Sequence, residues 1–196
     1  MLTGLNVGVL ALQGDFERHL YRLHALGLKG REVRRREDLA GLDGLIIPGG
    51  ESTTMNLLID RFEMREPLTD LCRTKGVWGT CAGMIMLARA VDDARIKPLG
   101  IIDISVQRNA YGRQVHSFHT SISVNWNGRP RNLSASFIRA PQVAAYGPEV
   151  KVLAEYEKNP VLLSQRNCLV SSFHTELNDD LTLTKYYLES FVSVFK

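Results

Sequence analysis

The sequence predicts an α/β fold, a three-layer sandwich with a mainly parallel central sheet, helices on both faces and added antiparallel strands in the second half. In the first half of the 196-residue chain, short apolar runs alternate with segments of helical periodicity, as in proteins built around a parallel sheet. Over 101–124 and 149–173 the runs are short and partly alternating, which is typical of antiparallel strands. An amphipathic segment over 186–195 predicts a closing helix.

The composition is that of an ordinary globular protein, with 44% hydrophobic and 23% charged residues. The length suits one domain, which we expect to cover residues 1–196. A net charge of +3 is too small to indicate nucleic-acid binding, and we interpret the basic segment 29–36 as a solvated surface. No apolar run reaches the ~18 residues of a membrane-spanning helix. We therefore expect a cytoplasmic protein that binds neither nucleic acid nor membrane.

Three widely spaced cysteines, Cys72, Cys81 and Cys168, are present. Their odd number and wide spacing match neither a disulfide framework nor a zinc site. We accordingly expect no metal and no cofactor.

The first strand is predicted over 5–12, an apolar run that would be buried on both faces. Gln13-Gly14-Asp15 ends this strand, and Asp15 is expected to cap a helix over 16–26, whose apolar residues recur at helical spacing. Two histidines of this helix, His19 and His24, are expected at the surface.

A glycine-rich loop follows the next buried strand. A short charged strand over 32–35 and a helical turn over 39–42 lead to that strand, 44–47, which ends in Pro48-Gly49-Gly50-Glu51-Ser52-Thr53-Thr54. Paired glycines at the carboxyl end of a parallel strand let the backbone approach a ligand. Ser52 or Thr53 is expected to cap the helix that follows. For the loop taken alone, a plain strand–helix connection is the less favoured alternative, and the lysine of a phosphate-binding Walker loop is missing.

A nucleophile elbow is the central motif of the chain. After a helix predicted over 66–75, Gly79-Thr80-Cys81-Ala82-Gly83 separates an apolar strand from a helical pattern over 85–90. This is the spacing of a nucleophile elbow, with Cys in place of Ser. The sharp turn strains the nucleophile and crowds its neighbours, so glycine is needed on both sides. Cys81 is the predicted nucleophile; the alternative is a small buried residue beside two packing glycines.

A cysteine nucleophile needs a base, and the base needs an orienting group. His174 follows an apolar strand over 169–173, and Glu176 comes two residues later. If the extended backbone continues, both side chains project from one face, about 6–7 Å apart along the strand. The carboxylate then accepts the Nδ1–H of the imidazole and leaves Nε2 facing a thiol. Without the elbow, a surface pair is the alternative interpretation.

The motifs together resemble a known family. The elbow, the loop 48–54 and Phe173-His174-Thr175-Glu176-Leu177 are similar to the signatures of class I glutamine amidotransferases. A narrower resemblance, to the glutaminase subunit of pyridoxal 5′-phosphate synthase, rests on that loop and on Leu12-Gln13-Gly14-Asp15, Gln107-Arg108-Asn109-Ala110-Tyr111-Gly112-Arg113-Gln114 and Phe137-Ile138-Arg139-Ala140-Pro141. These matches run from the first strand to the last. Thr175 stands where the family usually has proline; because threonine suits an extended strand, we expect little change in the placement of His174.

The resemblance implies hydrolysis of L-glutamine to L-glutamate and ammonia by a triad of Cys81, His174 and Glu176. The backbone N–H groups of Gly50 and Ala82 are the candidates for the oxyanion hole, Ala82 because it follows the nucleophile. The resemblance further implies a glutamine pocket, in which an arginine suits the α-carboxylate and a glutamate the ammonium. Its implied residues are Gly49, Gly50, Glu51, Arg108, Ile138 and Arg139. Without the family, surface salt bridges are the alternative for both arginines.

The resemblance also implies a partner, the synthase subunit, which is a (β/α)₈ barrel that consumes the ammonia within a hetero-oligomer. Gln13, beside the oxyanion site, is implied in coupling this partner to the glutaminase. Other functions stay open: a glutaminase subunit of another amidotransferase such as imidazole glycerol phosphate synthase, a catalytically idle regulatory module, and a cysteine peptidase or α/β-hydrolase relative. The hydrolase order is disfavoured because the carboxylate follows the histidine instead of preceding it.

Overall fold

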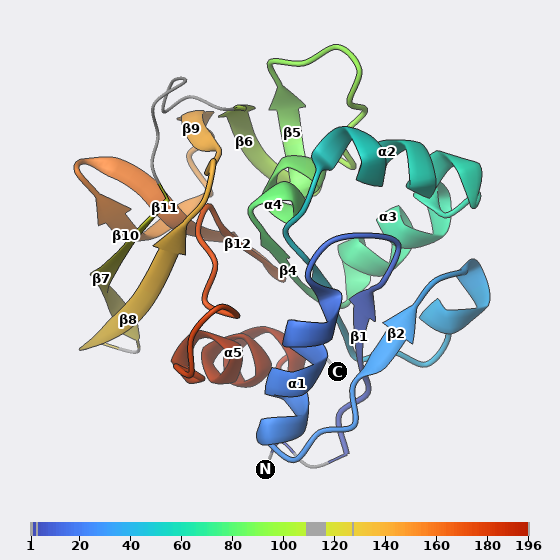
Figure 1. The fold of residues 1–196 in the computed structure, drawn as a ribbon, viewed down its shortest axis with the longest axis horizontal. Helices are drawn as coiled ribbons and strands as arrows, with labels where there is room; N and C mark the ends of the chain where they lie inside the picture. The colour runs from blue at the N-terminus through green and yellow to red at the C-terminus, as the bar shows by residue number, and fades with distance from the viewer. Residues whose placement is uncertain (1, 3, 109–116, 127, 196) are drawn as a thin grey trace.

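A seven-stranded sheet forms the middle layer of the computed structural model, which describes residues 2, 4–108, 117–126 and 128–195 (Figure 1). The strand order is β10-β11-β12-β4-β3-β1-β2. Neighbouring strands from β2 to β12 run parallel, whereas β11 is antiparallel to both β12 and β10. The mainly parallel sheet and the antiparallel strands added from the second half are therefore confirmed. Its strands are β1 (Val7–Leu10), β2 (Arg31–Val33), β3 (Gly44–Ile47), β4 (Gly76–Thr80), β10 (Lys151–Tyr156), β11 (Asn159–Gln165) and β12 (Cys168–Ser171).

The central strands are apolar on both faces because each face has its own hydrophobic core. Successive side chains of a strand point to opposite faces of the sheet. In β3, Ile46 belongs to one core, and its neighbours Leu45 and Ile47 belong to the other. In β4, Val77 and Trp78 are divided in the same way. Both cores are thus built from the same short apolar runs.

Each core is closed by an outer layer. One face is covered by three helices and a small sheet. The helices are α2 (Ser52–Arg61), α3 (Arg65–Thr74) and α4 (Ala82–Leu87), and the strands of the small sheet are β5 (Ala88–Val91), β6 (Ile102–Gln107) and β9 (Gln142–Tyr146). The other face of the sheet is covered by two helices, α1 (Phe16–Ala25) and α5 (Thr182–Tyr187), and by the hairpin of β7 (Phe118–Trp126) and β8 (Arg129–Phe137). The three-layer sandwich is confirmed. None of the helices in the described part of the chain is long and apolar enough to cross a membrane.

Several predicted boundaries are wrong. The helix after Cys81 ends at Leu87, because the next residues, Ala88–Val91, pair with β6 as strand β5. The closing helix begins at Thr182 and continues as a π-helical segment, Leu188–Val192. The charged strand is Arg31–Val33, and the helical turn is a 3-10 helix over Arg36–Leu39. These errors concern where helices and strands begin and end, which contacts with neighbouring segments determine.

The expected cap of α2 is also wrong. Glu51 is the N-cap residue, in place of Ser52 or Thr53. Its carboxylate accepts backbone hydrogen bonds from Thr53 at 3.2 Å and Thr54 at 2.7 Å. A carboxylate at this position satisfies free N–H groups and interacts favourably with the helix dipole. The cap is therefore also a residue of the predicted glutamine pocket.

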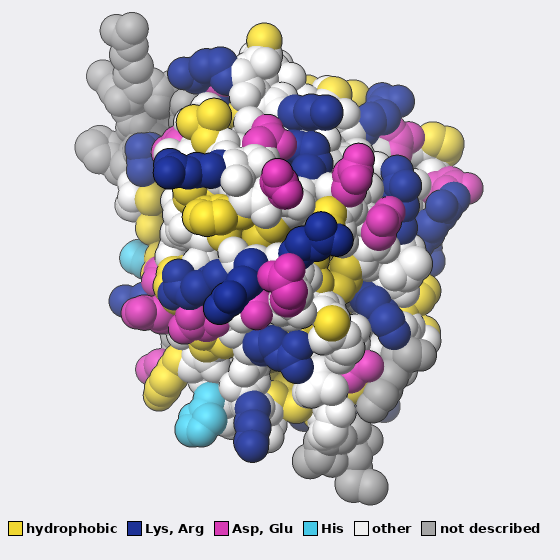
Figure 2. Space-filling model, turned by 90° about the vertical axis from the view of Figure 1, so that its right-hand side faces the viewer, with side chains coloured by type: hydrophobic (Ala, Val, Ile, Leu, Met, Phe, Trp, Pro, Cys, Tyr) yellow, Lys and Arg dark blue, Asp and Glu magenta, His cyan; other side chains and the backbone are white. Residues whose placement is uncertain are grey.

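Arginines of the basic segment 29–36 form ion pairs and hydrogen bonds with nearby residues of the chain. Arg34 pairs with Glu32 at 2.7 Å and lies 5.1 Å from the ring centroid of Phe16. Arg31 donates a hydrogen bond to the carbonyl of Ala40 at 2.9 Å. On the face that carries α2, α3 and β2, Figure 2 shows Lys and Arg side chains interspersed with Asp and Glu. This face offers no continuous basic surface.

Candidate active site

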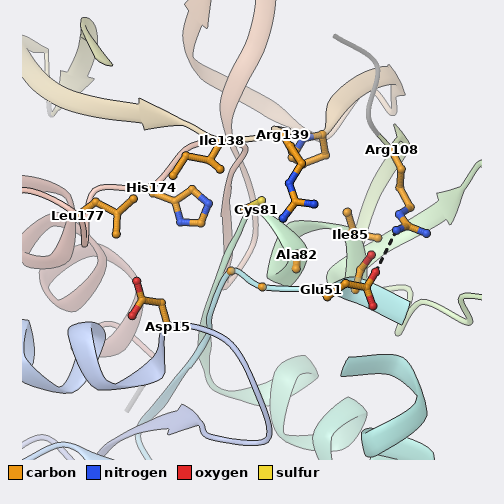
Figure 3. A pocket seen from close by; sticks show the side chains of 14 residues that line it. Asp15, Glu51, Cys81, Ala82, Ile85, Arg108, Ile138, Arg139, His174 and Leu177 are labelled. Atoms are coloured by element: carbon orange, nitrogen blue, oxygen red, sulfur yellow. Dashed lines mark hydrogen bonds and ion pairs between the residues drawn. The ribbon is translucent and has the colours of Figure 1, made fainter. Parts of the chain in front are cut away.

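A cavity of about 250 Å³ lies beyond the carboxyl ends of β3 and β4 (Figure 3). Ligands of open α/β sheets bind at this edge. In addition to predicted residues, the cavity is lined by residues that sequence reasoning did not assign to the site: Asp15, Ser52, Ile85, Pro141 and Leu177. Within the described residues, no group of three or more His, Cys, Asp or Glu side chains could hold a metal ion. The predicted residues that line the cavity are Gly49, Gly50, Glu51, Cys81, Ala82, Arg108, Ile138, Arg139 and His174.

Cys81 occupies the strand–helix turn expected of an elbow. It follows β4 directly and is the N-cap residue of α4, with φ 49° and ψ −101°. A non-glycine residue rarely adopts a positive φ, and such strain is common at functional positions. Gly83 permits the turn to pack closely, since a Cβ there would lie 2.0 Å from the carbonyl oxygen of Ile47. The glycine pattern of the motif therefore has a steric cause in this fold.

His174 and Glu176 meet, but not by the expected route. The extended backbone does not continue to Glu176: β12 ends at Ser171, and Glu176 lies in a turn. His174 is instead held by backbone hydrogen bonds to Ser136 of β8, at 2.8 and 2.9 Å. Its Nδ1 still lies 2.5 Å from Glu176 Oε1. In Figure 3 the imidazole projects into the cavity on the side of the Cys81 sulfur.

The charges of this pair stabilise each other. Burial by itself lowers the pKa of His174, but hydrogen bonding and charge interactions with Cys81 and Glu176 outweigh it and raise the pKa to about 10. Burial raises the pKa of Glu176, but its electrostatic interactions with His19 and His174 and the hydrogen bond from His174 lower it to about 2. At neutral pH the imidazole is therefore protonated, and a positive charge lies near the cysteine sulfur.

The two arginines of the predicted pocket differ in their partners. Arg108 pairs with Glu51 at 3.2 Å and with Asp93. Burial raises the pKa of Glu51, but hydrogen bonds from Thr53 and Thr54 outweigh it and lower the pKa to about 2. Arg139 has φ 45° and forms no ion pair with any residue that the structure describes. Its guanidinium projects into the cavity (Figure 3). The cavity thus contains an ionised carboxylate and an unpaired cation.

Gln13 lies against the glycine loop and outside the cavity lining. Its Oε1 accepts a hydrogen bond from the backbone N–H of Glu51 at 3.2 Å, and its buried Nε2 has no partner within the described residues. A Cβ on Gly50 would lie 2.4 Å from this Nε2, so the two residues are in close contact. Of the predicted motif 107–114, residues 109–114 lie outside the described residues.

His19 was expected at the surface, and this prediction is wrong. The side chain is buried, with the residue only 1% exposed, and its Nε2 lies 3.6 Å from Glu176 Oε1. His24 is exposed, as expected. His19 comes three residues after Phe16 and four before Leu23, both of which contribute to the core. The helical spacing therefore places His19 on the same buried face of the helix as Phe16 and Leu23. The expectation of a surface position rested only on the polarity of histidine.

Thr175, which stands between the two residues of the pair, is 1% exposed, and its hydroxyl has no partner within the described residues. A buried hydroxyl without a hydrogen bond is destabilising, so we expect Thr175→Val to raise the free energy of unfolding by about 1 kcal/mol. Urea denaturation measures this change. Thr175→Ser is the control, because it keeps the hydroxyl and loses the methyl group. A less stable valine variant would contradict the assignment of an unpaired hydroxyl.

The fold and site together define a class. A strained cysteine at a strand–helix turn, beside an imidazole–carboxylate pair at the carboxyl edge of a parallel sheet, is the arrangement of a cysteine-dependent α/β enzyme. The particular family is shown by sequence. The chain belongs to the SNO glutamine amidotransferase family, whose model matches residues 9–193.

Relatives agree with this family over nearly their whole length. The chain is 45% identical over 184 residues to the pyridoxal 5′-phosphate synthase subunit PdxT of Fervidobacterium nodosum, covering 93% of this chain and 95% of the relative. It is 47% identical over 185 residues to the PdxT subunit of Thermosipho africanus, covering 94% and 97%. A crystal structure described as a glutamine amidotransferase has 43% identity and a TM-score of 0.87, covering 93% of this chain and 97% of that one.

Proposed function

We propose that this chain hydrolyses L-glutamine to L-glutamate and ammonia, and supplies the ammonia to a synthase partner that makes pyridoxal 5′-phosphate. Family membership and the two PdxT subunits, which match this chain along nearly its full length, support the reaction and its purpose. The observation that carries the proposal is that Cys81 and His174 line one cavity and that Glu176 binds the imidazole of His174. The three cysteines are free thiols, as is usual in the cytoplasm, where we place the protein.

The chemistry follows from the charge on the pair. With His174 protonated, Cys81 acts as a thiolate and attacks the carbon of the side-chain amide. His174 then gives its proton to the departing nitrogen, which leaves as ammonia, and a thioester of glutamate remains on the sulfur. The neutral imidazole next takes a proton from water, which attacks the thioester and releases glutamate. Glu176 holds the Nδ1–H throughout, so that Nε2 faces the reacting atoms.

The remaining cavity residues bind glutamine and the oxyanion. The backbone N–H groups of Gly50 and Ala82 are proposed to stabilise the tetrahedral oxyanion; removing one such donor typically costs on the order of 10²–10³ in rate. Arg139, the unpaired cation, suits the α-carboxylate of glutamine. Glu51 suits the α-ammonium, and Arg108 holds its carboxylate in place. Gly49 and Ile138 complete the pocket.

The synthase partner is proposed to be a (β/α)₈ barrel in a hetero-oligomer with this chain. Gln13 contacts the loop that carries Gly50 and Glu51. A partner that moves Gln13 would therefore change the oxyanion site directly, which supports a role for Gln13 in coupling the two subunits.

The test is release of glutamate and ammonia from L-glutamine by this chain, with and without a pyridoxal 5′-phosphate synthase barrel subunit. We expect the partner to increase the rate of release. Activation only by an imidazole glycerol phosphate synthase barrel would assign the chain to that pathway. No release with either barrel, together with no labelling of Cys81 by a glutamine-like electrophile, would identify an idle regulatory module and overturn the proposal.

A further inference from the structure

A second imidazole, which is not part of the cavity lining, lies close to the triad. His19, from the buried face of α1, places Nε2 3.6 Å from Glu176 Oε1. This is the same oxygen that lies 2.5 Å from Nδ1 of His174. The other oxygen, Oε2, is buried and has no partner within the described residues. The Glu176 carboxylate therefore lies between two imidazoles, and both approach the same oxygen atom.

The surroundings of His19 determine which ring nitrogen carries the proton. Nδ1 is buried and has no partner within the described part of the chain, whereas Nε2 faces the carboxylate and lies 3.4 Å from Thr80 Oγ1. A proton on Nδ1 would leave a buried N–H unpaired and direct a lone pair at a carboxylate. The Nε2–H form avoids both costs. Burial lowers the pKa of His19, so the ring is neutral.

His19 is also fixed rigidly against the elbow. Its ring meets Trp78 of β4 edge-on, with centroids 5.5 Å apart, and Thr80 directly precedes the nucleophile. One turn further along α1, Arg22 donates hydrogen bonds to the carbonyls of Asn178 and Asp180 in the turn after Glu176. The buried face of α1 thus contacts the carboxylate through His19 and binds the segment that follows it through Arg22.

We propose that His19 is a positioning residue of the triad, which directs its Nε2–H at Glu176 Oε1 and so holds the carboxylate against His174. This inference rests on the proposed catalytic roles of Cys81, His174 and Glu176. A buried carboxylate needs donors to stay ionised and in place. His174 supplies one donor, but it must change its protonation state during the reaction. His19 keeps the same protonation state throughout. His19 therefore keeps the acceptor in position through both halves of the reaction.

The test compares His19→Leu and His19→Gln in the glutaminase assay with the synthase subunit present. Leucine fills the site without a donor, and we expect kcat to fall about tenfold with little change in KM. Glutamine places an amide N–H near the position of Nε2, and we expect it to restore most of kcat. The matched control is Leu23→Ala, a buried position of the same helix, which lowers the melting temperature and leaves kcat nearly unchanged.

A double-mutant cycle separates positioning from a general structural effect. If His19 acts through Glu176, His19→Leu changes kcat by less than about twofold in a Glu176→Gln background. The same tenfold loss in that background would overturn the inference, and so would a His19→Leu enzyme with the kcat of the wild type. Should Cys81→Ser, His174→Ala and Glu176→Gln all remain active, the proposed function itself would fail, an outcome distinct from failure of the role of His19.

Discussion

Replacing Cys81 by serine is expected to lower the rate of glutamine hydrolysis by about 10⁴-fold or more, as for loss of the nucleophile in other triad enzymes. The physical reason is the identity of the attacking atom. An imidazolium beside the sulfur supports a thiolate, whereas a serine hydroxyl cannot be ionised by the same charge at neutral pH. The substitution changes one buried atom, so the melting temperature should change little. Glutamate release in the presence of the synthase subunit measures the effect.

The other two cysteines provide the control. Burial raises the pKa of Cys72 to about 12 and that of Cys168 well above its ordinary value, so neither thiol is nucleophilic at neutral pH. Iodoacetamide at pH 7 should therefore label Cys81 alone, as mass spectrometry of the peptides would show. Cys72→Ala is expected to lower stability and retain kcat. Hydrolysis by Cys81→Ser within tenfold of the wild-type rate would disprove the role of this residue.

Gly49→Ala is expected to lower kcat about 10²-fold, because displacement of a catalytic group by about 1 Å has an effect of this size. A Cβ at this position would lie 2.3 Å from Cε1 of His174 and 3.1 Å from its Nδ1. The imidazole cannot simply rotate away, since Glu176 holds Nδ1 and Ser136 holds the backbone of His174 on both sides. The ring must therefore shift from its place beside Cys81. Steady-state kinetics with glutamine measure the loss.

The control for Gly49→Ala is a second double-mutant cycle, with His174→Ala. In a His174→Ala background the ring is absent, so Gly49→Ala should change the residual rate by less than about twofold. Equal losses in both backgrounds would mean that the methyl group disturbs the oxyanion loop or substrate binding instead. Full activity of Gly49→Ala would contradict the packing of the imidazole on this glycine.

The residues that we propose to react could be selected from sequence because their signals are local. The elbow glycines around Cys81 are required by a strand–helix turn, and the buried strands were visible as continuous apolar runs. Glu176 lies close enough to His174 in the chain to reach it by more than one backbone path. The expected extended path was wrong, and the pair nevertheless forms.

Other features depend on contacts between distant segments, which periodicity does not report. Glu51, the N-cap residue of α2, also pairs with Arg108, 57 positions later, and this second contact connects two segments far apart in the chain. Residues 88–91 leave the helix because β6 offers them backbone hydrogen bonds, which local propensity does not include.

By itself, the sequence determined the parallel α/β sheet and led to Cys81 and His174 as the proposed nucleophile and base, since each depends on residue types within one strand or turn. Only the tertiary structure decided that His19 is buried beside Glu176 and that Arg139 lines the cavity without an ion pair to the residues that the structure describes. The physical reason is that the environment of a polar side chain is set by the elements packed around it. A histidine on an apolar stripe becomes part of a site only when a distant carboxylate folds against it.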